Sequence, residues 1–480
     1  MKRLTALFTV LLVASVGLGD DKPRAWPQFR GPNGSGVADG AKPPVSFGPE
    51  KNVLWKVAVP SGMSSPIVAG DKLILTAFDG GKLYTIAYRR TDGAEEWRRV
   101  ASAKEVEPFH QTEGSPAAST SATDGERIVS YFGSCGLFCY DLAGKELWKY
   151  ELPPADIAGH FGSGVSPILV DGLVILVRDE MKEPRIIAIN AETGKLRWET
   201  KRQSNVSYST PVVWPTADGK QVVAAGHGRI IGYDLKTGAE KWWLSGMPSG
   251  PCASPTVADG ILFFAGWSPG GADDKSFQLP SFDEVLKQAG AEGDGFLTRE
   301  KAQKTFVKDM FDAVDANRDG KVTREEWDTL VKFLADGKNS AFAVKAGGSG
   351  DVTKSHLLWT KSRGMPYIPT GIVYHGQYVM VKDGGQVTAY DAESGKEVYV
   401  QERAVAVGRY YASPVAANGN IYFTSLDSGQ VTVLKAGSSP PEVVAKNPGL
   451  GERTAATPAI VDNVIYIRTA GHLYAFAEKN

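Results

Sequence analysis

Hydrophobic and polar positions alternate along many short segments of this chain. Residues 83–88 (LYTIAY) and 186–190 (IIAIN) show the pattern, and each is followed by a glycine-containing turn and a segment that carries a tryptophan, Trp97 or Trp198. Alternation with a period of two predicts half-buried strands. An Asp/Thr-Gly turn between two such strands predicts a hairpin. The pattern therefore predicts an antiparallel all-β protein.

The strand pattern recurs in units that begin with a Ser/Thr-Pro step and a short apolar run. Successive prolines of these steps are 50, 51, 44, 44, 114, 45 and 44 residues apart, so only one interval is long. Four short strands in about 45 residues are typical of one propeller blade. Eight units therefore predict eight blades. Their first residues are Ser65, Ser115, Ser166, Thr210, Ser254, Ser413 and Thr457, with Ile368-Pro369 as a degenerate eighth step.

The first and last strand segments complement each other. Residues 473–476 match the third strand of a unit and have no tryptophan strand after them, whereas residues 53–57 form a tryptophan strand with no unit before them. We expect the N-terminal strand to complete the last blade, because this closes the ring and removes an exposed sheet edge.

The long interval in the fifth unit predicts an insertion, residues 269–339, between two strands of one blade. The propeller then comprises residues 51–268 and 340–480, preceded by an N-terminal extension, residues 20–50. Inside the insertion the apolar period becomes helical. The residues predicted to share helix faces are Phe306, Met310 and Val314 in one helix and Trp327, Leu330, Val331 and Leu334 in the next.

Residues 315–326, between these two helices, match the EF-hand calcium pattern D-x-[DN]-x-[DN]-G-x5-E at each fixed position. Calcium takes six to eight oxygen ligands, and Gly320 permits the sharp turn that such a loop needs. The alternative is an Asp/Asn-rich turn that binds no metal. The predicted ligands of one Ca²⁺ are Asp315, Asn317, Asp319, Lys321 through its carbonyl, Thr323 through a water, and Glu326.

A second copy of this loop lies upstream. Residues 294–300 repeat the pattern of residues 319–325, but the first and twelfth positions are Gly290 and Lys301. Neither side chain offers a carboxylate, so we expect a structural partner without metal. A shifted loop could still use Glu292, Asp294 and Glu300.

The first nineteen residues predict export. Lys2 and Arg3 form a cationic region, residues 4–16 are apolar, and small residues follow. The apolar stretch is too short to span a bilayer. We expect a signal peptide at residues 1–19 and a periplasmic or extracellular protein with no membrane span; the alternative is an uncleaved anchor.

The charge balance bears on nucleic-acid binding, and the cysteine positions bear on disulfide formation. The chain has 53 Lys plus Arg and 54 Asp plus Glu, which gives no electrostatic argument for nucleic acid. Cys135 and Cys139 lie on or beside one strand, where their Cα atoms would be roughly 13 Å apart, beyond the ~7 Å limit for a disulfide. We expect free thiols.

Loops that precede the Ser/Thr-Pro strands should converge at the mouth of the central channel. Their polar residues could bind an anionic or aromatic ligand, and His110 with Glu113 could transfer protons. Alternatively, they are ordinary polar loop residues. The set comprises His110, Gln111, Glu113, His160, Tyr208, Arg363, Tyr367, Arg409, Tyr410, Tyr411 and Arg453.

The theme Ala-x-Asp-x-x-Thr-Gly-Lys-x-x-Trp and the opening residues 26–32 (WPQFRGP) resemble the pyrroloquinoline-quinone-type repeat. That repeat occurs in quinoprotein alcohol dehydrogenases and in the outer-membrane assembly scaffold lipoprotein. The resemblance covers nearly all of residues 26–480 apart from the insertion and concerns the fold more than the function. We expect Trp26, Phe29 and Arg30 to fasten the N-terminal segment to a blade; the alternative is a surface motif.

Two functions follow as hypotheses. The resemblance to dehydrogenases implies a quinone held against a tryptophan and an adjacent-cysteine disulfide, with a calcium ion and an Asp base. No Cys-Cys pair exists here, so pyrroloquinoline quinone is not expected. The favoured hypothesis is a non-enzymatic exported scaffold that binds a protein or an envelope polymer, with calcium ordering the inserted helices. The alternative is a periplasmic oxidoreductase or another enzyme that uses the channel mouth.

Overall fold

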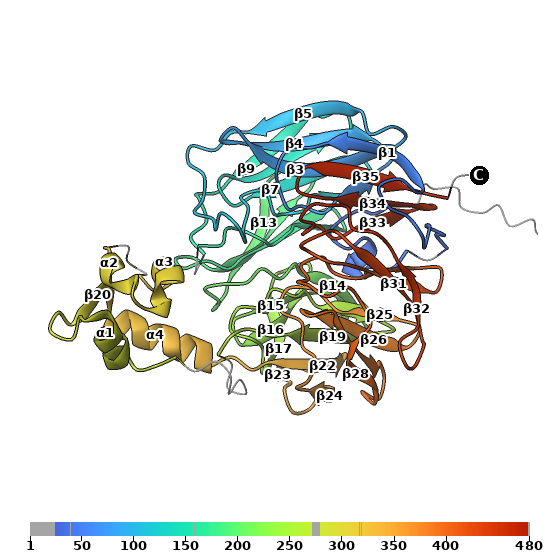
Figure 1. Cartoon of the computed structure of the whole chain (residues 1–480). Helices are drawn as coiled ribbons and strands as arrows, with labels where there is room; N and C mark the ends of the chain where they lie inside the picture. Colours follow the sequence, from blue (N-terminus) through green and yellow to red (C-terminus); the bar gives the residue numbers. More distant parts are fainter. Residues whose placement is uncertain are drawn as a thin grey trace, which may run out of the picture.

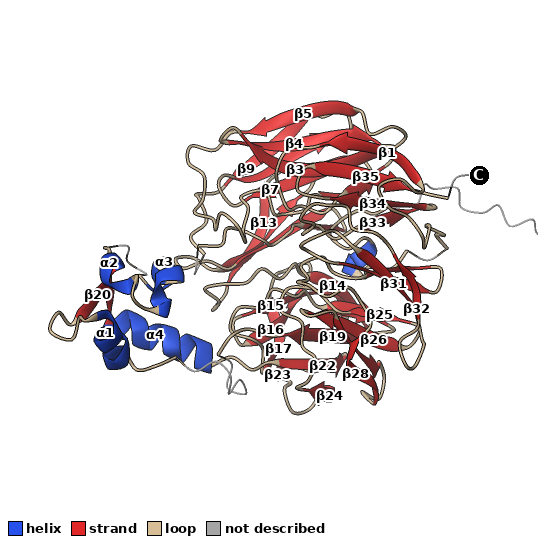
Figure 2. Ribbon diagram, in the orientation of Figure 1, coloured by secondary structure: helices blue, strands red, loops and turns tan. Residues whose placement is uncertain are grey.

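The strands form eight antiparallel sheets around a central axis, which confirms the predicted eight-bladed β-propeller (Figures 1 and 2). The computed structural model describes residues 25–38, 40–157, 160–270, 279–315, 317 and 319–478. The predicted signal peptide, residues 1–19, lies outside these ranges. No helix within them is long and apolar enough to cross a membrane.

The first four blades follow one another in sequence, and each runs from its inner to its outer strand. Blade 1 contains β2 (Ile67–Ala69), β3 (Lys72–Asp79), β4 (Lys82–Arg89) and β5 (Glu95–Ala101), and blade 2 contains β6 (Ala122–Thr123), β7 (Arg127–Phe132), β8 (Gly136–Asp141) and β9 (Glu146–Glu151). Blade 3 contains β10 (Ile168–Val170), β11 (Leu173–Arg178), β12 (Arg185–Asn190) and β13 (Leu196–Lys201). Blade 4 contains β14 (Val212–Thr216), β15 (Gly219–Gly226), β16 (Arg229–Asp234) and β17 (Glu240–Ser245), with β23 (Gly350–Asp351) added in parallel at its edge.

The remaining blades include the interrupted fifth blade and the closing eighth. Blade 5 contains β18 (Thr256–Ala258), β19 (Ile261–Gly266), β22 (Ser340–Lys345) and β24 (Leu357–Lys361), and blade 6 contains β25 (Ile372–Tyr374), β26 (Gln377–Lys382), β27 (Gln386–Asp391) and β28 (Glu397–Arg403). Blade 7 contains β29 (Val415–Ala417), β30 (Asn420–Thr424), β31 (Val431–Lys435) and β32 (Val443–Lys446). Blade 8 contains β33 (Ala459–Val461), β34 (Val464–Arg468), β35 (His472–Phe476) and β1 (Val53–Ala58).

Blade 8 is closed as expected. Strand β1 pairs antiparallel with β35, with Trp55 opposite Ala475 and Val57 opposite Leu473. The N-terminal strand thus supplies the outer strand that the C-terminal unit lacks, and the ring has no open end.

Tryptophans on the outer strands lock neighbouring blades together. The indole N–H of Trp148 donates to the carbonyl of Ala191 in the next blade at 2.8 Å, and the ring covers Gly194. A Cβ at Gly194 would lie 2.7 Å from that ring, and its φ of 67° already favours glycine. The recurring Thr-Gly turn in the sequence is therefore the site on which the tryptophan of the preceding blade packs.

A ring of hydroxyl groups joins all eight inner strands around the channel. The side-chain oxygen of one residue in each blade accepts the backbone N–H of its counterpart in the preceding blade, at 2.9–3.1 Å, and the eight bonds form a closed circle. We call this the hydroxyl ring. Its members are Ser65, Thr120, Ser166, Thr210, Ser254, Thr370, Ser413 and Thr457.

Two predicted unit starts were wrong. In blade 2 the ring residue is Thr120, and Ser115-Pro116 lie in the loop before it. In blade 6 it is Thr370, two residues after Ile368. The ring requires a hydroxyl at this position but no proline after it, so the Ser/Thr-Pro step marks the position in only six blades.

A buried arginine seals the junction between blades 8 and 1. Arg468 at the end of β34 donates to the carbonyls of Ser64, Thr76 and Pro60 at 2.9–3.1 Å and to the Ser64 hydroxyl at 2.6 Å. It is 1% exposed and has no ion pair among the described residues. Burial lowers its pKa to about 10, so the guanidinium stays charged at neutral pH and satisfies four oxygens at once.

Residues 26–38, the N-terminal strap, cross the end of the channel opposite the mouth. The strap bonds to blade 1 at Val68 and to blade 2 at Thr123. It bonds to blades 5 and 6 through Arg30, which reaches Thr256 Oγ1 and the carbonyl of Gly371. Further bonds reach blade 4 at Val213 and blade 7 at Ala416. The expected fastening to one blade is thus a fastening to six.

Short helices lie between β19 and β22 and extend to one side of the disc (Figure 1). Strands β20 and β21 pair between the two loops, with Leu297 opposite Val322. Both residues belong to a separate small core that includes Phe282, Phe311 and Trp327. We call residues 279–339 the helical insert. Its elements are α1 (Phe282–Ala289), β20 (Phe296–Thr298), α2 (Arg299–Ala302), η2 (Phe306–Asp309), α3 (Phe311–Val314), β21 (Lys321–Thr323) and α4 (Arg324–Ala335).

The prediction of which residues share a helix face in the insert is confirmed only in part. Met310 has φ −122° and ψ 9°, which separates η2 from α3, so Phe306, Met310 and Val314 do not share one helix, and Phe306 is exposed. In α4, Trp327 is buried and its indole N–H donates to the carbonyl of Pro280, whereas Val331 is exposed. The three cysteines are free, as expected.

We predict that Arg468→Met lowers the free energy of unfolding by about 2–4 kcal/mol, because the buried carbonyls of Ser64, Thr76 and Pro60 lose their charged donor. Urea denaturation of the variant and wild type measures the difference. Arg363→Met, at an exposed arginine, is the control and should change stability by no more than about 0.5 kcal/mol. Equal midpoints for the Arg468 variant and wild type would contradict the prediction.

Candidate functional site

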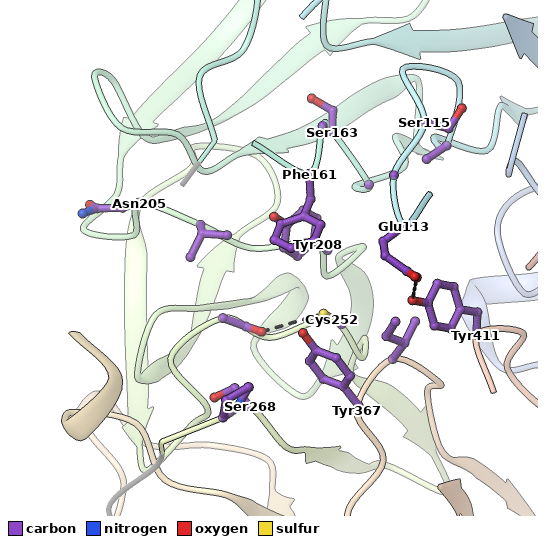
Figure 3. A pocket seen from close by; sticks show the side chains of 18 of the residues that line it. Glu113, Ser115, Phe161, Ser163, Asn205, Tyr208, Cys252, Ser268, Tyr367 and Tyr411 are labelled. Atoms are coloured by element: carbon purple, nitrogen blue, oxygen red, sulfur yellow. Dashed lines mark hydrogen bonds between the residues drawn. The ribbon is translucent and has the colours of Figure 1, made fainter. Parts of the chain in front are cut away.

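A cavity of about 1070 Å³ lies between the channel mouth and the helical insert (Figure 3). We call it the mouth cavity. Phe29 of the N-terminal strap and residues of loops from several blades line it. The cavity is within the size range of small-molecule sites in proteins.

The floor of the mouth cavity is the hydroxyl ring. Seven of its eight members line the cavity, Ser254 being the exception. Each ring oxygen accepts a backbone N–H, and no described group accepts the hydroxyl proton of Ser65, Thr210 or Thr457. The floor therefore offers hydroxyl groups that can both donate and accept hydrogen bonds without disturbing the ring.

Aromatic side chains from separate loops form the wall. Figure 3 shows Phe161, Tyr208, Tyr367 and Tyr411 around one central space. Tyr367 is supported edge-on by Trp267, with ring centroids 5.3 Å apart. The Tyr208 hydroxyl is buried and has no hydrogen-bond partner in the described structure.

Helix α4 and the preceding loop form the roof. The predicted metal ligands Asn317, Thr323 and Glu326 line the mouth cavity, and so do Leu330 and Phe333 from the same side of α4. The calcium-loop candidate and the channel-mouth candidate, which the sequence presents as separate sites, therefore border one space.

The C-terminal end of α4 is held against blade 4. The Phe333 ring stacks on His227 with centroids 4.4 Å apart and planes at 15°. The Ser249 hydroxyl donates to the carbonyl of Leu334 at 3.1 Å, and the Lys338 N–H donates to the carbonyl of Met247 at 2.8 Å. The insert thus extends from blade 5 and also contacts blade 4, which fixes α4 over the mouth.

Glu113 is the centre of an ionic network on the wall. Its carboxylate accepts hydrogen bonds from Tyr411 and, at 3.2 Å each, from Arg409 and Arg453, and Arg409 also pairs with Asp427. Burial alone would raise the Glu113 pKa, but these hydrogen bonds and the charge of Arg453 outweigh it and hold the pKa below its usual range. Glu113 is therefore an ionised anchor that joins three loops.

The predicted proton-transfer pair is not assembled. His110 Nδ1 accepts the backbone N–H of Glu113 at 3.2 Å, and its ring stacks on Phe161 at 5.3 Å. No side-chain contact between His110 and the Glu113 carboxylate is present in the described structure. The Tyr410 hydroxyl donates to the carbonyl of Ala406.

Seven of the eleven predicted mouth residues, Arg409 and Arg453 among them, are not among the described residues that line the mouth cavity. Gln111 lines a neighbouring cavity of about 420 Å³. The remaining four of the seven are His110, His160, Arg363 and Tyr410.

The loop of residues 315–326 turns its side-chain oxygens toward its own backbone. The buried Asp315 carboxylate accepts N–H groups of Asp319 at 3.2 Å and Gly320 at 3.0 Å. Glu326 accepts the N–H and hydroxyl of Thr323, both at 2.8 Å, and the N–H of Asn317 at 3.4 Å. In the described ranges, no group of three or more His, Cys, Asp or Glu side chains is arranged to hold a metal.

The upstream loop contains a cation of its own. The Lys301 ammonium donates to the carbonyl of Gly290 at 3.3 Å and pairs with the Asp294 carboxylate. Lys301, at the twelfth position of this loop, thus bonds directly to Gly290, at the first position. In a calcium loop these two positions would instead provide ligands to the metal.

A buried glutamate lies behind the wall and was missed by the sequence analysis. Glu107 accepts the Ser163 N–H at 3.2 Å and its hydroxyl at 2.7 Å, and Ser163 lines the mouth cavity. Burial raises the Glu107 pKa to about 7, although the Ser163 hydrogen bonds and the charge of Arg178 oppose the shift. Nothing in the local sequence marks Glu107 as buried, because its surroundings come from other loops.

Sequence and structure comparisons identify related proteins. A family described as "Outer membrane protein assembly factor BamB" matches residues 48–158, 139–266 and 313–480. No curated protein sequence matches the chain.

Solved structures show the same fold at low identity. BamB from Moraxella catarrhalis is 13% identical, with a TM-score of 0.52 over 88% of this chain and 98% of that one. A europium-containing methanol dehydrogenase is 10% identical, with a TM-score of 0.57 over 95% of this chain and 99% of that one. The computationally designed Ika8 protein is 12% identical, with a TM-score of 0.51 over 89% of this chain and all of that one. These likenesses concern the fold alone.

We predict that Glu107→Gln removes a pH dependence of stability. The folded-state pKa of about 7 exceeds the ordinary value of 4.5, so the folded state holds a proton that the unfolded state releases, and stability falls as pH rises between these values. The variant should equal wild type near pH 4.5 and be more stable by roughly 2–3 kcal/mol near pH 8. Urea denaturation at both pH values measures this; the exposed Glu105→Gln is the control, and an unchanged pH slope would refute the prediction.

Proposed function

This chain belongs to the propeller family described as outer membrane protein assembly factor BamB, and we propose that it is an exported scaffold that binds a protein or envelope partner and holds one calcium ion in residues 315–326. The family match supports the proposed scaffold role, because the family description names assembly of outer membrane proteins. That description also supports a periplasmic or envelope location for this chain.

The donor set of the loop fits calcium. It provides the carboxylates of Asp315, Asp319 and Glu326, the Asn317 amide, the Thr323 hydroxyl and a backbone carbonyl at Lys321, all oxygen ligands of the kind that calcium prefers. Asp315 is 3% exposed and its hydrogen bonds come only from backbone N–H groups among the described residues. A buried carboxylate without a cation is costly, and calcium would remove that cost. When bound, the ion would supply charge compensation and cross-link the loop to the start of α4.

The upstream loop needs no metal in this proposal. The Lys301 ammonium already bonds to Gly290 and Asp294. We expect one calcium ion per chain, with an affinity on the order of 10⁻⁴ to 10⁻³ M or somewhat tighter, as in extracellular EF-hand-type sites with few carboxylates.

The mouth cavity does not fit pyrroloquinoline quinone. The cofactor carries three carboxylates, whereas the described lining residues include Glu113, Glu325 and Glu326 and no Lys, Arg or His. No tryptophan is among these lining residues, so none is available there to stack on a quinone. We therefore favour the scaffold over a quinoprotein-type oxidoreductase.

The rim of the disc offers surface for a protein partner. Large apolar side chains on the outer strands of different blades are 42–47% exposed: Leu54 in β1, Leu147 in β9, Leu196 in β13 and Leu358 in β24. Such side chains beside open strand edges are suited to pairing with another chain.

We predict that calorimetric titration of the chain without residues 1–19 shows one saturable calcium site. Glu326→Gln should weaken it on the order of 100-fold, because the twelfth ligand binds through both oxygens. Glu300→Gln, at a corresponding helix start in the upstream loop, is the control and should leave the affinity unchanged. Absence of calcium heat in wild type would remove the metal half of the proposal, and two equal sites would contradict the role given to Lys301.

We predict that a photo-crosslinking residue at Leu147 or Leu196 captures the same envelope protein in the native host. The same residue at the exposed turn position Glu192 is the control for accidental contact. Mass spectrometry of the adducts identifies the partner. Adducts equally frequent at the control position, or none at the rim positions, would contradict a rim-bound scaffold.

A further inference from the structure

The mouth cavity has an unusual charge pattern. None of the described residues that line it is Lys, Arg or His, whereas three are glutamates, Glu113, Glu325 and Glu326. The arginines that pair with Glu113, Arg409 and Arg453, are not among these lining residues. Among the described residues, the groups that line the cavity are therefore acidic or uncharged, and the uncharged ones are hydroxyl, amide, thiol and apolar groups.

The negative charges of the three carboxylates are neutralised by cations to different degrees. Glu113 is paired with two arginines, and Glu326 is the proposed twelfth calcium ligand. Glu325 is exposed on the first turn of α4 and forms no ion pair among the described residues. An anionic ligand would be repelled by the Glu325 carboxylate and would find no cationic side chain among the described lining residues. The cavity therefore disfavours anionic ligands.

The wall offers aromatic rings to a ligand. Phe161, Tyr208 and Tyr367 come from three loops and border the central space in Figure 3, and Phe333 of α4 also lines the cavity. Aromatic faces attract alkylammonium groups, and the attraction is stronger where water is excluded. The unpartnered Tyr208 hydroxyl adds a buried polar atom on the same wall.

We propose that the mouth cavity binds an organic cation, an ammonium group that carries apolar substituents. The aromatic wall contacts the substituents and the positive charge, and the carboxylates set the sign of the ligand charge. The hydroxyl ring below accepts polar groups of the ligand. This site goes beyond the proposed scaffold function and does not require that the loop of residues 315–326 binds calcium.

The test compares choline with 3,3-dimethylbutan-1-ol, a neutral molecule of the same shape, by saturation-transfer NMR titration of the chain without residues 1–19. Choline should bind at least tenfold more tightly than the alcohol. Tyr367→Leu and Tyr208→Leu should each weaken choline binding at least fivefold. Tyr150→Leu, at a half-buried tyrosine of β9 outside the cavity lining, is the control and should bind like wild type.

Each other outcome overturns the proposal. Equal affinity for both molecules would show an apolar site without charge selection, and no choline binding at about 50 mM would show no such site. Choline binding that neither tyrosine variant weakens would place the ligand elsewhere. Thermal midpoints within a few degrees of wild type establish that the variants are folded, and repeating the titration in EDTA separates this result from the calcium proposal.

Discussion

The hydroxyl ring is the constraint on which the rest of the propeller depends. Eight backbone N–H groups near the axis would be buried without partners, and each is satisfied by the side chain of the next blade. Because the bonds close into a circle, the position of each inner strand is set by both neighbours. The loops that lead into these strands are consequently held at fixed positions around one mouth, where Tyr208, Tyr367 and Tyr411 line one cavity.

The helical insert lies over that mouth and lines part of the mouth cavity. Its own small core around Phe282 and Trp327 makes it a separate folding element, yet the Phe333–His227 stack ties it to blade 4. Helix α4 runs from the proposed metal ligand Glu326 to this contact. The helix therefore joins the loop of residues 315–326 to the contact with blade 4.

The blade count and the closure of the ring were predictable, because both depend on local strand patterns and regular spacing. Thr120 and Thr370 were not predictable as ring members, because the ring requires only a hydroxyl and neither threonine has the proline that follows the other six. The loop of residues 315–326 was recognisable because its ligands are contiguous. Its position above the channel was not, because it depends on His227, which stacks on Phe333, and on Ser249, which bonds to Leu334, and both partners lie far from the loop in sequence. Arg30 and Arg468 likewise find most of their partners on blades that are far from them in sequence.

The N-terminal strap has a consequence for the order of folding. Blades in a repeat array normally contact only their neighbours, but residues 26–38 bond to blades 1, 2, 4, 5, 6 and 7. These bonding sites exist together only after blade 7 has formed. The segment that precedes all the blades in the sequence must therefore dock late, and once docked it links blades that do not touch, so that separate units lose their independence and unfold together.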